Sequence, residues 1–185
     1  MRVIAGSARG IRLKAPPTGT RPTTDRLREA LFSILQARLD GSRVLDLFAG
    51  SGALGIEALS RGAEEAVFVE EHRMAGKILR KNLDTVRLAE RAAVFERDVF
   101  AYLRSSRSVF DLILADPPYA SNADCDLAGA LLADPCLPAR LSGGGLVVLE
   151  VEAEREDPAA PGWEMIDRRV YGSSAILFYA RQESR

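Results

Sequence analysis

The four residues Asp116-Pro117-Pro118-Tyr119 form the segment whose chemistry is easiest to specify. They follow an apolar run, Val109 to Ala115, which we expect to be a buried strand. Two prolines stop strand pairing and stiffen the loop. The Asp116 carboxylate and the Pro117 carbonyl accept hydrogen bonds, and Tyr119 adds a flat apolar ring. Two acceptors and a ring suit a planar aromatic base with an exocyclic amine. An ordinary Pro-Pro turn is the alternative interpretation.

Three more carboxylates, Asp46, Glu70 and Asp98, stand at the ends of successive predicted strands. In an open α/β sheet, ligands bind beyond the carboxyl ends of the strands. Any one of these acids could simply cap a helix or pair with a cation. As a set beside a glycine loop, they indicate a ligand site: Glu70 for ribose hydroxyls, Asp98 for an adenine amine, and Asp46 for the other end of the ligand.

The glycine loop follows the first predicted strand, which we place from Val44 to Phe48. After it we expect a helix over Ala53 to Ser60, a second strand over Ala66 to Val69, and then the acid. Glycine lets the backbone turn sharply and approach a ligand, so we expect the loop to contact a cofactor through Ala49, Gly50, Ser51 and Gly52.

The loop also fits the dinucleotide pattern G-x-G-x-x-G, which is weak evidence alone. The carboxylate of Asp46 would repel a pyrophosphate at this loop. It suits S-adenosylmethionine, which carries a sulfonium and an amino group but no phosphate.

The remaining elements complete an α/β fold. We expect helices from Thr24 or Asp25 to Arg38, over 72–88, from Val99 to Leu103 and from Leu127 to Leu132, and strands over Ala92 to Glu96, Leu146 to Val151, Trp163 to Val170 and Ser174 to Ala180. Before them, Met1 to Thr20 suggests a small hairpin. This order predicts an open, mostly parallel sheet whose last two strands form an antiparallel hairpin.

Composition restricts the class of protein. A chain of 185 residues with 47% hydrophobic side chains is expected to form one domain, with at most a small appendage. No apolar run is long enough for a membrane span, and the N-terminus lacks the apolar region of a signal peptide. Cys125 and Cys136 fit no metal spacing, so we expect no metal site and a reducing, cytoplasmic setting.

Charge is distributed unevenly although the net charge is only −1. Residues 1–24 contain no acid, whereas 150–157 is acidic. A basic end on a neutral protein can contact phosphates, and the expected contacts are Arg2, Arg9, Arg12 and Lys14. A solvated basic tail is the alternative.

Two stretches resemble a known family. VLDLFAGSGALGIEAL, with Glu70, Asp98 and the Asp116–Tyr119 segment, resembles class I S-adenosylmethionine-dependent amino-methyltransferases. VIAGSARGIRLKAP and RPTTDRLREALF closely resemble one branch, the bacterial small-subunit ribosomal RNA guanine-N2 methyltransferases. The resemblance spans nearly the whole chain and departs mainly between Glu150 and Trp163.

The resemblance implies a Rossmann-like, seven-stranded sheet over 21–185, with residues 1–20 as a basic β-hairpin for RNA contact. It implies methyl transfer from S-adenosylmethionine to the N2 amine of one guanine in 16S rRNA, with Asp116, Pro117 and Tyr119 at the reacting base. Arg21 and Thr23 then lie where they could close over the methionine moiety. The expected partner is 16S rRNA in an assembling small subunit, and we expect a monomer.

Three alternatives share part of the pattern. An NAD-dependent dehydrogenase would have the glycine loop and Glu70, but it gives no reason for the Asp116–Tyr119 segment. A methyltransferase acting on DNA adenine or a protein glutamine would share the chemistry. A non-catalytic RNA-binding module would keep the basic hairpin but would need no complete catalytic loop.

Overall fold

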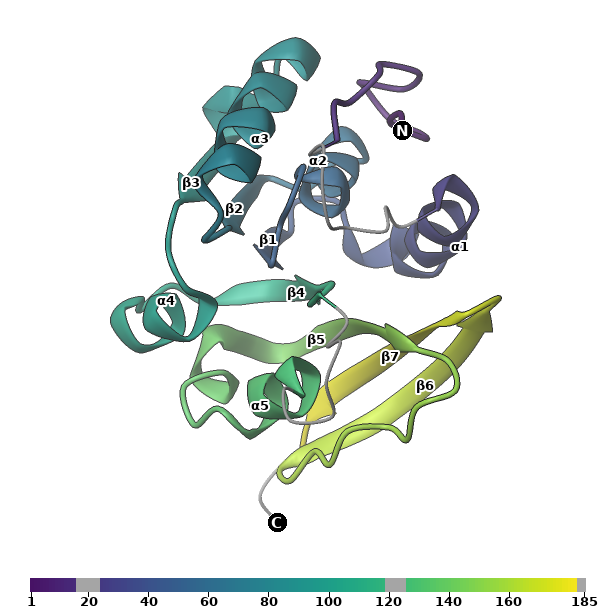
Figure 1. Ribbon diagram of the computed structural model, residues 1–185, viewed down its shortest axis with the longest axis vertical. Helices are drawn as coiled ribbons and strands as arrows, with labels where there is room; N and C mark the ends of the chain where they lie inside the picture. Colours follow the sequence, from purple (N-terminus) through teal and green to yellow (C-terminus); the bar gives the residue numbers. More distant parts are fainter. Residues whose placement is uncertain (16–23, 119–125, 183–185) are drawn as a thin grey trace.

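The structure is a computed structural model that describes residues 1–15, 24–118 and 126–182. Its centre is a seven-stranded sheet in the order β3-β2-β1-β4-β5-β7-β6 (Figure 1). The strands are β1 (Arg43–Leu47), β2 (Glu65–Val69), β3 (Ala92–Phe95), β4 (Phe110–Ala115), β5 (Leu141–Glu152), β6 (Trp163–Tyr171) and β7 (Ser174–Arg181). The first five strands run parallel, and β7 pairs antiparallel with both β5 and β6. The predicted fold class is confirmed.

Helices cover both faces of the sheet. They are α1 (Asp25–Leu35), α2 (Ala53–Ser60), α3 (Arg73–Val86), α4 (Val99–Ser105) and α5 (Leu127–Ala133), with short 3-10 turns at Gln36–Arg38, Ala89–Arg91 and Pro138–Arg140. Helices α1, α2 and α3 pack on one face, and α4 and α5 pack on the other. No helix in the described part of the chain is long and apolar enough to cross a membrane.

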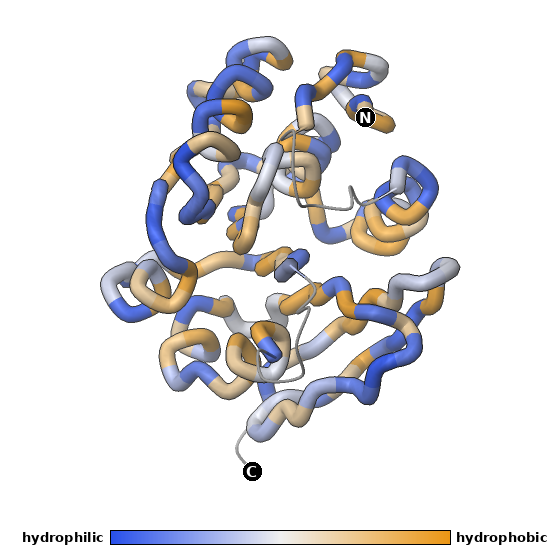
Figure 2. The backbone as a smooth tube through the Cα atoms, viewed as in Figure 1, coloured by the Kyte–Doolittle hydropathy of each residue, from blue (hydrophilic) through white to orange (hydrophobic). Residues whose placement is uncertain are grey.

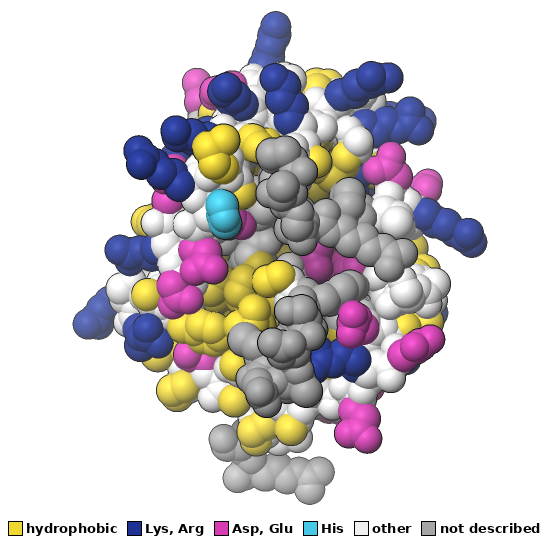
Figure 3. Space-filling model, in the orientation of Figure 1, with side chains coloured by type: hydrophobic (Ala, Val, Ile, Leu, Met, Phe, Trp, Pro, Cys, Tyr) yellow, Lys and Arg dark blue, Asp and Glu magenta, His cyan; other side chains and the backbone are white. Residues whose placement is uncertain are grey.

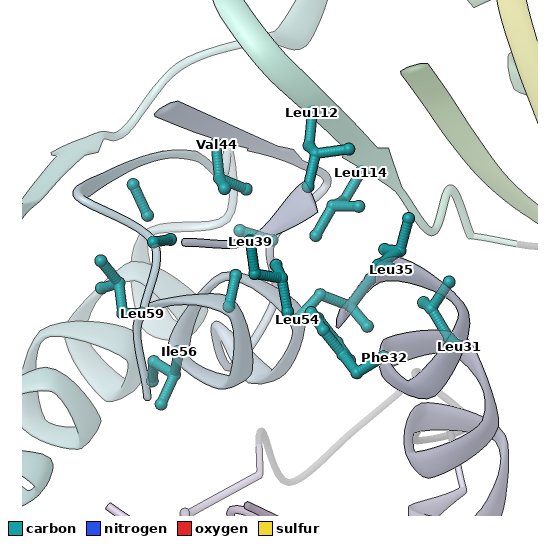
Figure 4. Close-up of a cluster of buried hydrophobic side chains, with 14 of the residues drawn as sticks. Leu31, Phe32, Leu35, Leu39, Val44, Leu54, Ile56, Leu59, Leu112 and Leu114 are labelled. Carbon is teal, nitrogen blue, oxygen red and sulfur yellow. The ribbon is translucent and has the colours of Figure 1, made fainter. Parts of the chain in front are cut away.

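The two cores follow from the alternation of side chains along the strands. Figure 4 shows how α1 and α2 meet one face of the sheet, with Leu31, Phe32, Leu35, Leu54, Val44, Leu112 and Leu114 converging. In Figure 2 the central strands are mostly hydrophobic, and the outer turns of α3 are hydrophilic. Burial on both faces explains why β1, β2 and β4 read as nearly continuous apolar runs.

Several predicted boundaries differ from the structure by a few residues, and two of these differences are informative. Strand β1 ends at Leu47 because Phe48 has a φ of 57°, which is outside the β region. Strand β5 begins at Leu141, five residues before the predicted Leu146. Its pairing with β4 shifts register between Phe110 and Leu112, and the three glycines beside this irregularity remain in the strand.

The N-terminal segment, residues 1–15, forms a tight loop closed by a single antiparallel bridge between Arg2 and Arg12. Its apolar side chains, Val3, Ala8 and Leu13, are buried in the same core as α1 and α2. A Cβ on Gly6 would lie 1.8 Å from the backbone oxygen of Ser60. The loop is therefore seated on α2.

Candidate active site

The loop between β1 and α2 has an unusual backbone. Phe48, Gly50 and Gly52 have φ values of 57°, 54° and 80°. Positive φ is costly for a side chain such as that of Phe48, and such strain is found mainly at functional sites. Among the described residues, a Cβ on Gly50 would have one neighbour within 4 Å, the Phe48 oxygen at 3.9 Å. This side of the loop therefore leaves room for a ligand to approach the backbone.

The neighbouring loop residues hold this turn in place. The Ala49 amide donates to the backbone oxygen of Val69 on β2 at 3.1 Å, and the Gly52 amide donates to the Ala49 oxygen at 2.7 Å. Ala49 and Ser51 are both buried. A Cβ on Gly52 would lie 2.0 Å from Leu79 of α3, so glycine is required there for packing as well as for its φ.

Glu70 lies at the carboxyl end of β2 and reaches back to the glycine loop. Its carboxylate accepts from the Gly50 amide at 2.7 Å and from the His72 amide at 2.7 Å. These bonds orient the carboxylate beside the open side of Gly50. A carboxylate can accept about four hydrogen bonds, so the two hydroxyls of a ribose are chemically compatible with it.

Asp46 is buried in β1 and accepts from the Gly55 amide of α2 at 2.8 Å. Burial raises the pKa of Asp46 well above its usual value, and the nearby charges of Asp116 and Glu70 raise it further. The three carboxylates therefore share one electrostatic environment. Sequence reasoning missed the contact with Gly55, by which Asp46 caps the first turn of α2.

Asp98 follows β3 and caps α4, because its carboxylate accepts from the Ala101 amide at 2.8 Å. The side chain is exposed at the same edge of the sheet as Glu70. Capping a helix was the alternative to ligand binding for any one of these carboxylates. It occupies one of the two carboxylate oxygens, so the expected contact with an adenine amine stays a prediction.

Asp116, Pro117 and Pro118 follow β4 directly. Ala115 pairs with Leu47 of β1 on one side and with Leu149 of β5 on the other. The loop therefore begins between the glycine loop and the end of β5. Tyr119 lies outside the described residues, as do Arg21 and Thr23.

Asn82 on α3 is a site residue that sequence reasoning missed. It is buried, and its amide nitrogen donates to the backbone oxygens of Lys14 and Ser51, both at 2.9 Å. Its amide oxygen accepts from the Lys14 amide at 2.9 Å. One side chain thus joins the N-terminal segment to the glycine loop. A single polar residue in a helix gives no sequence signal for such a bridge.

Arg28 of α1 makes a second connection to the N-terminal segment. It is fully buried and donates to the backbone oxygen of Arg2 at 2.6 Å and to Asp25 at 2.8 Å. Burial lowers the pKa of Arg28 against the opposing effects of Asp25 and Glu57. Glu57 itself accepts from the amides of residues 4 and 5 at 2.8 and 3.0 Å. The segment is therefore held from α1, α2 and α3.

The predicted phosphate contacts, Arg2, Arg9, Arg12 and Lys14, are all exposed. Arg2 lies 3.8 Å from Asp25. Figure 3 shows basic side chains gathered over the N-terminal segment and α3. On α3 and at its end, Lys77, Lys81 and Arg87 are also exposed. The bond between Asn82 and Lys14 places this helix beside the basic segment.

Among residues 1–15, 24–118 and 126–182, no group of three or more His, Cys, Asp and Glu side chains could hold a metal ion.

Comparison with known proteins identifies the family. The model of the family described as conserved hypothetical protein 95 matches residues 1–180. Ribosomal RNA small subunit methyltransferase D of Escherichia coli K12 is 36% identical over 184 residues, which cover 98% of this chain and 90% of that protein. The chain belongs to the small-subunit ribosomal RNA methyltransferase D family.

Solved structures agree with this family assignment. The hypothetical protein TTHA0928 of Thermus thermophilus superposes with a TM-score of 0.82 at 37% identity, over 96% of this chain and 98% of that one. A ribosomal protein L11 methylase from Lactobacillus delbrueckii gives a TM-score of 0.70 at 21% identity, over 94% and 86% of the two chains. The second similarity concerns the fold alone, which is that of class I methyltransferases.

Proposed function

We propose that this protein transfers a methyl group from S-adenosylmethionine to the exocyclic N2 amine of a guanine in 16S rRNA. One observation carries the proposal: two hydrogen-bond acceptors, at Asp116 and Pro117, follow β4 beside the strained glycine loop. Membership of the methyltransferase D family supports the reaction class and an RNA substrate.

The residues around the glycine loop fit S-adenosylmethionine. The open side of Gly50 and the carboxylate of Glu70 suit the ribose, and Asp98 suits the adenine amine. Asp46 is buried at the end of β1, where a ligand that carries positive charge would favour its ionised form. Arg21 and Thr23 precede α1, and we assign to them closure over the methionine end.

The acceptors at Asp116 and Pro117 explain how a weak nucleophile can react. The lone pair of the guanine N2 nitrogen is delocalised into the ring, and the base must leave its stack to be reached. We propose that the Asp116 carboxylate and the Pro117 carbonyl accept the two N2 hydrogens. Tyr119 is assigned to stack on the base. Accepting both hydrogens lets the nitrogen become pyramidal and points its lone pair away from the loop.

S-adenosylmethionine, when bound, supplies an electrophilic methyl group on a sulfonium centre. The protein then contributes mainly position, because holding two reactants in line removes much of the entropic barrier. We assign to Asp116 the proton that the nitrogen loses after it has become cationic.

Binding of RNA is assigned to the basic N-terminal segment and the neighbouring face of α3. Arg2, Arg9, Arg12 and Lys14 carry exposed positive charge on a segment with no acid. Phosphate contacts of this kind position a nucleic acid without reading its sequence. We expect the protein to act in the cytoplasm as a monomer on 16S rRNA in an assembling small subunit.

A methyl-transfer assay over four substrates tests the proposed substrate class. Purified protein and tritiated S-adenosylmethionine are incubated with small-subunit particles that lack the modification, naked 16S rRNA, duplex DNA and a protein extract. We expect label in RNA, with particles at least matching naked RNA. Label in DNA or protein would favour one of the other amino-methyltransferases. A protein that purifies with bound NAD would point to a dehydrogenase.

A further inference from the structure

Glu150 lies at the carboxyl end of β5, next to the loop that follows β4. Leu114 pairs with Val148 and Ala115 pairs with Leu149, so the next step along these parallel strands brings Asp116 beside Glu150. Side chains alternate along a strand, and Glu150 therefore shares a face with Val148. It is buried, although two residues farther along, Glu152 is only half-buried.

An open cleft adjoins this position. Among the described residues, it is lined by Pro117 and Pro118, by the charged side chains Glu150, Glu152 and Arg155, and by Leu127 in the first turn of α5. The cleft thus combines the loop assigned to the reacting amine with a neighbouring buried carboxylate. A base held at Asp116 and Pro117 would present its Watson–Crick edge toward the end of β5.

We propose that Glu150 accepts a hydrogen bond from the N1–H of the target guanine and so selects guanine over adenine. The inference rests on the proposed function, because it assumes that the N2 amine lies at Asp116 and Pro117. On guanine, the group next to N2 along this edge is the N1–H donor. On adenine, the corresponding N1 atom carries a lone pair, and a carboxylate repels it.

The chemistry of a buried carboxylate suits this role. Glu150 already interacts within the protein, and a carboxylate offers about four acceptor sites on its two oxygens, so it can accept from a base in addition to those partners. Burial also strengthens the discrimination, because an unmatched polar contact away from water is costly. If Glu150 had only a structural role, its replacement would affect folding and leave the base preference of the enzyme unchanged.

A base analogue separates these two roles. 2-Aminopurine keeps the 2-amino group but has a lone pair at N1 and only hydrogen at C6. Small-subunit particles are reconstituted with ligated 16S rRNA that carries guanine or 2-aminopurine at the methylated position. Single-turnover rates are then measured for the wild type, Glu150→Gln, and the control Glu164→Gln on exposed β6.

We expect the wild type to prefer guanine by at least about tenfold. Glu150→Gln can turn an amide donor toward the N1 lone pair, so its preference for guanine should fall by about tenfold or more. Glu164→Gln should keep the wild-type ratio. Equal slowing of Glu150→Gln on both bases would overturn the inference. A ratio of guanine to 2-aminopurine rates near one in the wild type would also overturn it, and this result does not depend on how the variant folds.

Failure of the proposed function gives a different result. In that case the wild type forms no N2-methylguanosine on the guanine particle. If the wild type does form it and the base ratio does not respond to Glu150→Gln, only the assignment of Glu150 is wrong.

Discussion

The side-chain amide of Asn82 donates to the backbone oxygen of Ser51 at 2.9 Å, so α3 holds the glycine loop directly. The same side chain exchanges two hydrogen bonds with the backbone of Lys14. The segment assigned to RNA and the loop assigned to the cofactor therefore share one buried anchor.

Replacing Asn82 by Ala should weaken both attachments. It removes the partners of the Ser51 oxygen and of both backbone groups of Lys14. Loss of such partners costs about 1–3 kcal/mol, and we expect lower stability to urea together with weaker S-adenosylmethionine binding by calorimetry. Thr85→Ala, on the exposed side of the same helix, is the control. Unchanged stability and affinity in Asn82→Ala would show that the bridge has no energetic role.

Gly55→Ala should destabilise the protein although alanine favours helices. Its Cβ would lie 2.3 Å from a ring carbon of Phe68 and 3.1 Å from the carboxylate of Asp46. Overpacking of this kind typically costs about 1–3 kcal/mol. Gly143→Ala is a matched control because no atom of the residues that the structure describes would lie within 4 Å of its Cβ. Urea denaturation compares the two, and equal stability of both variants would contradict the packing seen around Gly55.

The glycine loop and the edge of the sheet could be predicted from sequence. Parallel strands bring their carboxyl ends to one edge, so Asp46, Glu70 and Asp116 had to lie near one another once the strands were recognised. Local patterns also located α2, which has the predicted bounds.

Other features depend on contacts between distant segments and were not predictable. The bridge at Asn82 joins residues 31 and 68 positions away. The positive φ of Phe48 reflects how the loop is held by β2 and α3. The identity of its side chain does not predict this backbone conformation. The packing of residues 1–15 on α2 likewise depends on Glu57 and Ser60, which read locally as ordinary helix residues.

Asp46→Asn should stabilise the free protein increasingly as pH rises. Burial, with the charges of Asp116 and Glu70, raises the folded-state pKa of Asp46 well above the usual 3.8. The unfolded chain therefore ionises first, and wild-type stability falls as pH rises from about 3.8 to the folded-state pKa. Asparagine cannot ionise, and its amide oxygen can still accept from Gly55.

Urea unfolding at a series of pH values from about 4 to 8 checks this prediction. The free energy of unfolding of Asp46→Asn minus that of the wild type should grow with pH and then level off. Its steepest possible slope is about 1.4 kcal/mol per pH unit. A difference that does not change with pH would show that Asp46 has an ordinary pKa.

Neutralising Arg9 and Arg12 should weaken RNA binding and reduce its dependence on salt. Both side chains are exposed on the N-terminal segment. Each lost phosphate contact lowers the slope of log affinity against log salt by about 0.7–0.9. The control replaces Arg104 and Arg107, which are exposed at α4 and just after it, so net charge is matched. If both double variants changed the slope equally, the N-terminal segment would have no special role.

The most direct test of the account is the identity of the methylated nucleoside. Small-subunit particles that lack the modification are treated with the protein and labelled S-adenosylmethionine, and their 16S rRNA is digested and analysed by mass spectrometry. The account predicts N2-methylguanosine at one position with the wild type, and a steep loss with Asp116→Ala while S-adenosylmethionine affinity is nearly unchanged. Label in N6-methyladenosine, or undiminished N2-methylguanosine from Asp116→Ala, would contradict it.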